Sequence, residues 1–288
     1  MMTKSISKKQ IQETIKVNAK NALDEDRAFE DQTTKLLNKK IIGEAFIRSN
    51  QKAILCGIPW ANKSFKLINK KIKINWYAKE GDLIKKNQKI CSIKGPYKDL
   101  LIAERTALNF LQTLSGTATS TNSYVNLLKK YHTNLYDTRK TIPGLRIAQK
   151  YAVGIGGAFN QRLNLANGIL IKENHIQILG GIHSFLIELK KSKPLKDIQI
   201  EVENLNEFKI ALKHGAKNIL LDNFSIHNIK KAVDLNKKFA NLEASGDINK
   251  KTIISYAKTG VDRISVGSIT KNLEAIDFSM IIKQFKDV

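Results

Sequence analysis

Cysteine is scarce in this sequence, with only Cys56 and Cys91 among 288 residues. Two cysteines are too few for a disulfide framework or a zinc site, so we expect two reduced thiols in a reducing compartment. Long apolar runs are also lacking, and none approaches the ~18 residues that a membrane span requires. Residues 1–20 are polar and rich in lysine, without the apolar core of a secretory signal. These absences predict a cytoplasmic protein that does not span a membrane.

Acidic residues are outnumbered by basic ones, 26 against 49, which gives a formal net charge of +23. Such an excess is typical of proteins that bind nucleic acids. The lysines, however, are scattered in pairs along the chain, and neither aromatic residues nor an arginine-rich arm accompany them. We therefore interpret the charge as a bias of the surface and expect no nucleic-acid partner. A basic nucleic-acid-binding protein remains the alternative from a different class, and it predicts binding that weakens steeply with salt.

The two halves of the chain differ in the spacing of their apolar runs. In the first half, short apolar runs with turn signals at 80–82 and 94–96 predict strands, and residues 104–114 show helical spacing. In the second half, apolar runs alternate with helical patterns roughly every 20 to 35 residues, which indicates βαβ units and a parallel sheet. The first-half strands are expected at 41–43, 53–57, 72–76 and 90–93, and the second-half strands at 134–136, 168–171, 198–200, 219–221, 242–244 and 264–266. About six parallel strands, short of eight, predict a partly open β/α barrel.

Cations gather where these elements end. Arg139, Lys140, Arg146, Arg162 and Lys172 lie within about forty residues, each near a tight turn or the end of an apolar run. Several guanidinium and ammonium groups that converge on one point repel one another unless a polyanion binds between them. The pattern therefore predicts a binding site for carboxylates, phosphates or both.

Acidic and glycine-containing strand ends predict the rest of the site. Glu201 and Asp222 follow neighbouring predicted strands, and their carboxylates suit a hard divalent cation such as Mg²⁺. The last two strands end in 245–246 (Ser-Gly) and 267–268 (Gly-Ser), where backbone N–H groups can approach an anion. Barrel loops in this position frequently bind phosphate. We therefore expect a phosphate monoester at the last two strand ends.

At this point the sequence resembles the quinolinate phosphoribosyltransferase family. The resemblance runs in order from about residue 23 to the C-terminus. The blocks that carry it are 104–109 (ERTALN), 137–141 (DTRKT), 143–146 (PGLR), 150–153 (KYAV), 170–175 (LIKENH), 201–203 (EVE), 221–223 (LDN), 243–246 (EASG) and 264–267 (ISVG).

The resemblance implies a fold and a reaction. It implies an N-terminal α/β sandwich domain over residues 1–115, joined by the C-terminal segment 274–288, and a β/α barrel catalytic domain over 116–273. It further implies a homodimer with active sites between subunits. Enzymes of this family transfer the phosphoribosyl group of phosphoribosyl pyrophosphate to quinolinate, with Mg²⁺, and release nicotinate mononucleotide, pyrophosphate and CO2. The pyridine nitrogen is the nucleophile, so the protein needs no nucleophile of its own.

The resemblance also implies roles for individual residues. Arg139, Arg162 and Lys172 would bind the quinolinate carboxylates, and Arg105 would reach the same pocket from the partner subunit. Lys140, Glu201 and Asp222 would be the catalytic residues that face the ribose, the pyrophosphate and the metal. The remaining substrate-binding residues would be Gln161, beside the quinolinate, and Ser245, Gly246, Gly267 and Ser268, around the 5′-phosphate.

Some positions depart from the family pattern. Gln161 stands where the family usually has histidine, and an amide carries no charge or titratable proton. Gly154 replaces an expected arginine, and Asp247 brings a carboxylate close to the expected phosphate. These departures keep one alternative open within the same class: a paralogous phosphoribosyltransferase for another aromatic acid, such as the relative associated with molybdenum transport.

Overall fold

The computed structural model describes residues 6–37, 41–192 and 194–283. These residues form two compact units. We call 6–37, 41–122, 142–157 and 272–283 the N-terminal unit, and 123–141, 158–192 and 194–271 the barrel unit. Of the expected sandwich domain, residues 1–5, 38–40 and 284–288 lie outside the described residues.

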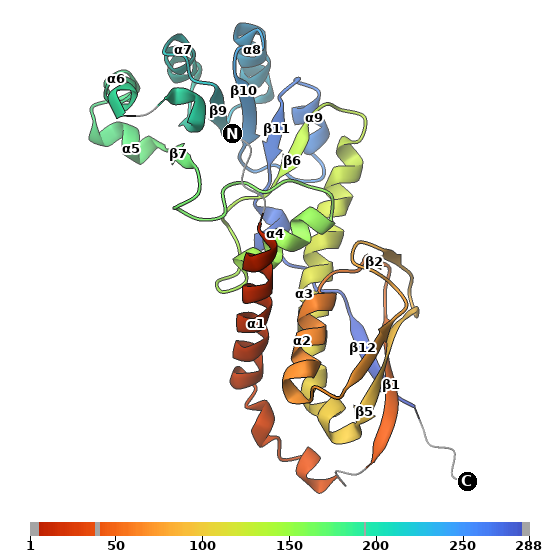
Figure 1. The fold of residues 1–288 in the computed structure, drawn as a ribbon. Helices are drawn as coiled ribbons and strands as arrows, with labels where there is room; N and C mark the ends of the chain where they lie inside the picture. The colour runs from red at the N-terminus through yellow and green to blue at the C-terminus, as the bar shows by residue number, and fades with distance from the viewer. Residues whose placement is uncertain (1–5, 38–40, 193, 284–288) are drawn as a thin grey trace. The chain divides into compact units, whose positions relative to one another are not determined.

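The N-terminal unit is built on an antiparallel sheet of four strands in the order β12-β1-β5-β3, beside a two-stranded pair β2-β4 (Figure 1). Its strands are β1 (Ile42–Ser49), β2 (Ala53–Ile54), β3 (Lys73–Trp76), β4 (Leu83–Ile84), β5 (Lys89–Pro96) and β12 (Phe278–Ile282). Its helices are α1 (Lys8–Glu25), η1 (Ala28–Glu30), η2 (Thr34–Leu36), α2 (Ile58–Ile68), α4 (Arg146–Ile155) and most of α3 (Tyr97–Leu128). The late strand β12 pairs with β1, so the chain returns to this sheet after the barrel.

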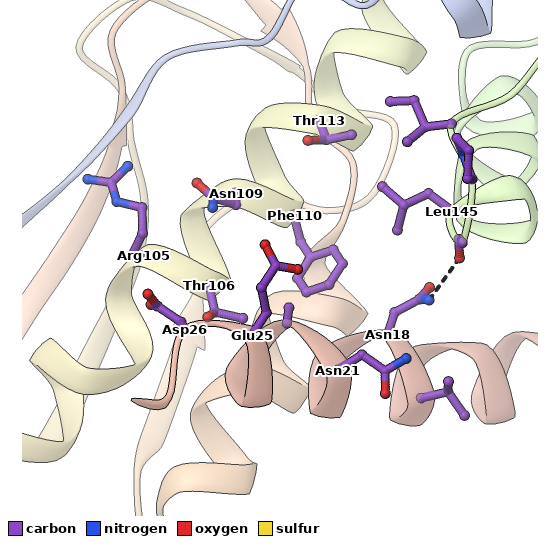
Figure 2. Close-up of a pocket in the computed structure, with 15 residues that line it drawn as sticks. Asn18, Asn21, Glu25, Asp26, Arg105, Thr106, Asn109, Phe110, Thr113 and Leu145 are labelled. Carbon is purple, nitrogen blue, oxygen red and sulfur yellow. Dashed lines mark hydrogen bonds between the residues drawn. The ribbon is translucent and has the colours of Figure 1, made fainter. Parts of the chain in front are cut away.

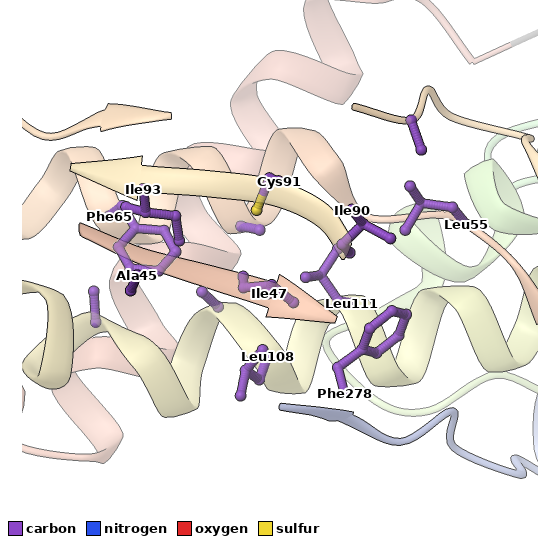
Figure 3. Close-up of a cluster of buried hydrophobic side chains, with 14 of the residues drawn as sticks. Ala45, Ile47, Leu55, Phe65, Ile90, Cys91, Ile93, Leu108, Leu111 and Phe278 are labelled. Atoms are coloured by element: carbon purple, nitrogen blue, oxygen red, sulfur yellow. The ribbon is translucent and has the colours of Figure 1, made fainter. Parts of the chain in front are cut away.

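Alternating burial holds this sheet onto its helices. On β1, Ala45 and Ile47 are buried, while the residues between them are less so. They pack with Cys91 of β5 and with Leu108 and Leu111 of α3 in one apolar core (Figure 3). Burial in this core raises the pKa of the Cys91 thiol to about 12. Both cysteines are free and buried, as the sequence predicts.

The predicted turn at 94–96 is wrong. Gly95 and Pro96 belong to β5, where they pair with Gly43 and Ile42 of β1. A Cβ at Gly43 would lie within van der Waals distance of the Tyr97 ring, so glycine is needed for this packing rather than for a turn. The predicted helix at 104–114 is confirmed as the middle of the longer α3.

The barrel unit contains the six predicted parallel strands, in the order β6-β11-β10-β9-β8-β7. The strands are β6 (Asn134–Tyr136), β7 (Ile169–Ile171), β8 (Ile198–Val202), β9 (Asn218–Asp222), β10 (Asn241–Ser245) and β11 (Arg263–Ser265). The helices are α5 (Glu173–Ile178), α6 (Ile182–Ser192), η3 (Leu195–Asp197), α7 (Leu205–Lys213), α8 (Ile226–Asn236), α9 (Ile253–Ala257) and α10 (Ser268–Lys271). Since β6 and β7 are the two edge strands of this sheet, the barrel is partly open, which confirms the expected α/β fold class.

Helices α6, α7 and α8 follow one another along the outer side of the parallel strands (Figure 1). Buried apolar residues such as Phe208 of α7 and Ile229 of α8 close that side of the sheet. Right-handed βαβ connections leave the carboxyl ends of all strands at one edge. In the described part of the chain, no helix combines the length and the apolar character needed to cross a membrane.

Candidate active site

The predicted site residues of the barrel unit follow its strands in the order of the sheet. Arg139 and Lys140 come after β6, Lys172 directly after β7, and Glu201 and Asp222 lie among the last residues of β8 and β9. Ser245 ends β10, and Gly267 and Ser268 follow β11. Because all six strands are parallel, these residues share one edge of the sheet, which is the ligand face of a β/α barrel.

Two guanidinium groups lie close together at this edge. Burial lowers the pKa of Arg162, the positive charge of Arg139 lowers it further, and the nearby carboxylate of Glu201 opposes the shift. Among the described residues, Nε of Arg139 and Nε of Arg162 are both buried without a hydrogen-bond partner. Buried donors of this kind cost free energy unless an acceptor meets them. The two groups are therefore suited to a ligand with more than one anionic oxygen.

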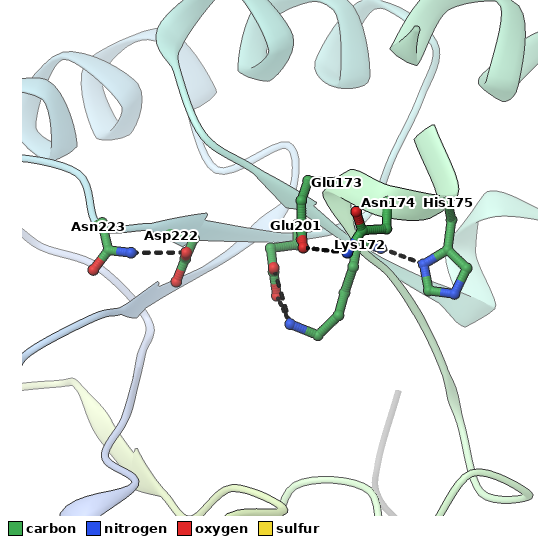
Figure 4. Close-up of polar contacts among 7 residues, drawn as sticks. All are labelled: Lys172, Glu173, Asn174, His175, Glu201, Asp222 and Asn223. Atoms are coloured by element: carbon green, nitrogen blue, oxygen red, sulfur yellow. Dashed lines mark hydrogen bonds and ion pairs between the residues drawn. The ribbon is translucent and has the colours of Figure 1, made fainter. Parts of the chain in front are cut away.

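Lys172 and Glu201 form an ion pair at the same edge (Figure 4). The Lys172 Nζ lies 3.0 Å from both carboxylate oxygens of Glu201, and its side chain is 44% exposed while that of Glu201 is 7% exposed. The backbone N–H of Lys172 donates to Nδ1 of His175 at 3.1 Å, so His175 orients the turn that carries the lysine. The ammonium group can thus reach a ligand while its base is fixed.

Glu201 and Asp222 are electrostatically close. Burial raises the pKa of the Glu201 carboxyl, the charge of Asp222 raises it further, and Lys172 opposes both effects. A divalent cation between the two carboxylates would relieve this repulsion, so the donor set fits Mg²⁺. Within the described residues, no group of three or more His, Cys, Asp or Glu side chains is gathered as a metal site. The remaining ligands would therefore be substrate oxygens and water, which is usual for Mg²⁺.

The glycines at the last two strand ends have close neighbours. Gly246 has φ +143°, and a Cβ there would lie 2.7 Å from Oδ1 of Asn223. At Gly267 a Cβ would lie 3.0 Å from Cδ of Lys140 and 3.3 Å from Oγ1 of Thr138. The Lys140 stem therefore runs across the backbone of the β11 turn. Ser268 begins α10, and its Oγ lies 3.3 Å from the hydroxyl of Tyr124.

Two threonines that sequence reasoning missed hold Lys140 in place. The backbone N–H of Lys140 donates to Oγ1 of Thr138 at 3.0 Å, and the buried Thr270 donates its hydroxyl to the Lys140 carbonyl at 2.7 Å. Thr138 lies inside the recognised block 137–141, so the sequence offered a signal for its importance. Thr270 is an ordinary helix residue in sequence, and only the fold brings it against Lys140.

Gln161 contacts a residue that was not predicted to matter. Its Nε2 donates to both carboxylate oxygens of Glu243 at 2.5 Å, and its backbone N–H donates to Oδ1 of Asp137 at 2.7 Å. Glu243 lies inside β10 and is 1% exposed, and Gln199 also donates to it at 2.8 Å. That Gln161 binds the substrate directly stays a prediction, and its amide is engaged inside the barrel.

Arg105 lies on α3, in the N-terminal unit, whereas the other predicted substrate-binding residues belong to the barrel unit. It lines a cavity of about 640 Å³ between α1, α3 and the segment 142–145 (Figure 2). Asp26, Asn109 and Asn18 share the lining, and Nδ2 of Asn18 donates to the Gly144 carbonyl at 3.1 Å.

Guanidinium groups, a lysine beside paired carboxylates, and glycine turns at the carboxyl ends of the strands of a partly open parallel barrel are features of the class of β/α-barrel proteins that bind small anionic ligands. Models of one family match nearly the whole chain: the quinolinate phosphoribosyl transferase N-terminal domain over residues 31–115 and its C-terminal domain over 117–281. The chain belongs to the quinolinate phosphoribosyltransferase family.

Individual relatives agree. The chain is 35% identical over 277 residues to a probable nicotinate-nucleotide pyrophosphorylase (carboxylating) of Methanocaldococcus jannaschii, covering 93% of this chain and 96% of the relative. It is 34% identical over 264 residues to a protein of the same description from Synechocystis, covering 90% of each. A solved nicotinate-nucleotide pyrophosphorylase from Francisella tularensis superposes with a TM-score of 0.90 at 43% identity, covering 94% of this chain and 97% of that one. These similarities do not favour the paralogue or the nucleic-acid-binding alternative.

Proposed function

We propose that this protein catalyses the decarboxylating transfer of the phosphoribosyl group from phosphoribosyl pyrophosphate to quinolinate, in de novo NAD biosynthesis. The observation that carries the proposal is the pair of buried, unpartnered Nε groups on Arg139 and Arg162 beside the Lys172–Glu201 ion pair. Quinolinate has two adjacent carboxylates, which supply acceptors for both guanidinium groups and for the ammonium group.

The same cations serve the decarboxylation. Loss of CO2 leaves carbanion-like charge on the ring carbon that carried the carboxylate. Arg139, Arg162 and Lys172 surround a small anionic ligand and stabilise that charge without reorganising. For catalysis, they must stabilise the developing carbanion more than they stabilise the bound substrate carboxylate.

Glu201 and Asp222 face the other substrate. Departure of pyrophosphate leaves oxocarbenium character at the ribose C1, and carboxylates nearby stabilise that positive charge. We propose that these residues also hold Mg²⁺, which neutralises the pyrophosphate leaving group when it is bound. The repulsion between the two carboxylates supports a cation at this place. Lys140, whose stem crosses Gly267, offers a further charge to the pyrophosphate.

The two late strand ends are proposed to hold the 5′-phosphate of the ribose. Ser245 and Ser268 supply hydroxyl donors, and Gly246 and Gly267 carry no side chain of their own, which favours the close approach of an anion to their backbone N–H groups. The close contacts of Asn223 and Lys140 with these glycines support a tightly shaped turn.

A homodimer completes the proposal, with Arg105 of one subunit reaching the partner's quinolinate site. Exposed apolar side chains on the N-terminal unit support an interface there: Val17 is 54%, Phe29 67% and Leu36 86% exposed. Co-expression of Arg105→Ala with Arg139→Ala tests it. Random mixing of two inactive chains should restore about a quarter of the wild-type activity, because half of the dimers then regain one intact site. No restoration would contradict the shared site. Two free, buried thiols support the proposed cytoplasmic location.

The activity itself is tested with purified protein, phosphoribosyl pyrophosphate, Mg²⁺ and quinolinate labelled at the 2-carboxylate. We expect labelled CO2 and nicotinate mononucleotide in equal amounts, and neither product from Arg139→Ala. Binding of quinolinate without either product would refute the proposed reaction. Turnover of another aromatic acid with quinolinate inert would show a different substrate.

A further inference from the structure

Glu243 is a fully buried carboxylate that the proposed reaction does not use. It pairs in register with Leu220 of β9, and Leu220 pairs in register with Glu201 of β8. Since paired residues of a parallel sheet share a face, Glu201 and Glu243 project to the same side, one on each flank of Leu220. Glu201 and Glu243 therefore lie in one row on the same face of the sheet. Of these two carboxylates, Glu201 forms an ion pair with a lysine.

Neutral donors surround Glu243 instead. Gln161 and Gln199 donate to it through their amides, Ser265 donates through its hydroxyl, and the charge of Arg263 acts from the next strand. Burial raises the pKa of Glu243, and these contacts work in the opposite direction. A buried carboxylate costs several kcal/mol unless its oxygens are satisfied, so these donors stabilise Glu243 inside the barrel.

The network reaches the substrate site through two consecutive residues. The Gln161 side chain ends on Glu243, and Arg162 directly after it lies close enough to Glu201 and Arg139 to respond to their charges. The backbone N–H of Gln161 is held as well, by the buried Asp137, which also accepts from Nδ2 of Asn160 at 2.9 Å. Phe159 forms a β-bridge with Tyr136, and residues 160–162 beyond it have no regular secondary structure. The side-chain contacts therefore hold the stretch between this bridge and Arg162.

We infer that Glu243 is a positioning residue of the quinolinate site, which acts by anchoring Gln161 and thereby fixing the place from which the Arg162 guanidinium reaches the substrate. The inference rests on the proposed function. It also explains why an amide suits position 161, because a neutral donor can satisfy a buried carboxylate without bringing a second charge into the barrel.

A double-mutant cycle tests the inference. Glu243→Gln keeps the shape but replaces one acceptor oxygen with an NH2 donor, which opposes the amide donors of Gln161 and Gln199. Gln161→Ala removes the anchor from the other side. Each should raise the KM for quinolinate about tenfold or more, since hydrogen bonds to charged groups carry this much. The KM for phosphoribosyl pyrophosphate should stay within about twofold, because its proposed ligands do not touch this network. The double variant should be no worse than either single variant, because both break the same contact.

Ser265→Ala is the matched control, because it removes a donor to the same carboxylate without touching the segment 160–162. It should leave both KM values unchanged. Thermal unfolding is measured for every variant. If Glu243→Gln does not fold, the comparison of Gln161→Ala with Ser265→Ala tests the inference by itself. Equal KM changes for both substrates, additive effects in the cycle, or an unchanged KM for quinolinate in Gln161→Ala would each overturn the inference. The proposed function would still stand if the wild-type protein turns over quinolinate. Absence of turnover in the wild type would overturn both.

Discussion

Glu201 and Glu243 make an instructive pair, because the same side chain flanks Leu220 on two strands and has two different environments. Glu201 faces a half-exposed ammonium group and a second carboxylate, whereas Glu243 is enclosed by amides and a hydroxyl. Burial raises the pKa of both carboxyl groups. The difference teaches that burial alone does not identify a catalytic carboxylate. The two differ in whether the partner can be exchanged for a ligand: Lys172 is half-exposed and is proposed to bind the substrate, whereas the amide partners of Glu243 lie inside the barrel.

The largest effect is expected when the exchangeable partner is removed. Lys172→Met should lower kcat/KM for quinolinate by about a thousandfold, because loss of the ammonium group leaves the buried Glu201 carboxylate unpaired and also removes a proposed substrate ligand. Steady-state kinetics with each substrate varied in turn measure this loss. The control is Lys191→Met, which breaks the exposed 2.7 Å ion pair with Glu188 on α6 and should change nothing beyond about twofold. A similar loss of kcat/KM in both variants would show that the Lys172–Glu201 ion pair matters no more for activity than the exposed Lys191–Glu188 pair.

A smaller effect is expected at the phosphate side. Gly246→Ala should raise the KM for phosphoribosyl pyrophosphate about tenfold and destabilise the protein by about 1–3 kcal/mol, because the φ of +143° and the contact with Asn223 both oppose a side chain. Gly215→Ala is the matched control: its φ is +90°, and nothing within 4 Å meets the new Cβ. The control should share the loss of stability and keep the wild-type KM. An unchanged KM in both variants would place the phosphate elsewhere.

The buried carboxyl group of Glu243 should make the free energy of unfolding depend on pH. Because the folded-state pKa of Glu243 is raised, the folded protein binds this proton more tightly than the unfolded chain. Its contribution to stability is fully present below the unfolded pKa and is lost as the pH rises through the folded pKa. Glu243→Gln lacks this loss, so its free energy of unfolding relative to the wild type should increase with pH, by about 1.4 kcal/mol for each unit of pKa shift.

Urea unfolding at a series of pH values from about 4.5 to about 8, roughly half a unit apart, measures this trend. The exposed Glu203→Gln is the control and should give curves parallel to the wild type. A constant difference between wild type and Glu243→Gln at every pH would show that folding does not raise the pKa of this carboxyl, and would contradict the pH account.

The smallest effect is expected at the support of Lys140. Thr270→Val removes the hydrogen bond to the Lys140 carbonyl and should cost about 1 kcal/mol of stability and a few-fold in kcat. Thr270→Ser keeps the hydroxyl and should retain wild-type kcat. If Thr270→Ser loses as much kcat as Thr270→Val, the methyl group rather than the hydrogen bond is what matters there.

The strands of the barrel and the residues at their ends could be predicted from sequence for a physical reason. Strands of a parallel sheet that is covered by helices are short apolar runs, and the polar residue that ends each run lies at the shared ligand edge. This made Lys172, Asp222 and Ser245 visible in sequence, and all six predicted strands are confirmed.

Contacts that depend on side-chain direction could not be read in this way. Glu243 belongs to a recognised block but occupies the middle of a buried strand, and only the register of β9 and β10 shows which way it faces. The pairing of Gly95 with Gly43 is a long-range event without a local signal, and the return of β12 to the N-terminal sheet was implied by the family resemblance alone. For the same reason, the hydrogen bond from the Gln161 amide to Glu243 has no local signal in the sequence, and substrate binding by Gln161 stays a prediction.

The central claim is that Arg139, Arg162 and Lys172 together recognise two carboxylates on one ring. Calorimetric titration of the wild-type protein with quinolinate and with nicotinate, which lacks the 2-carboxylate, tests it most directly. The account predicts that quinolinate binds about a hundredfold more tightly, since a second buried charged contact carries roughly this factor, and that Arg162→Ala loses most of the difference. Equal affinities for the two acids in the wild type would contradict it.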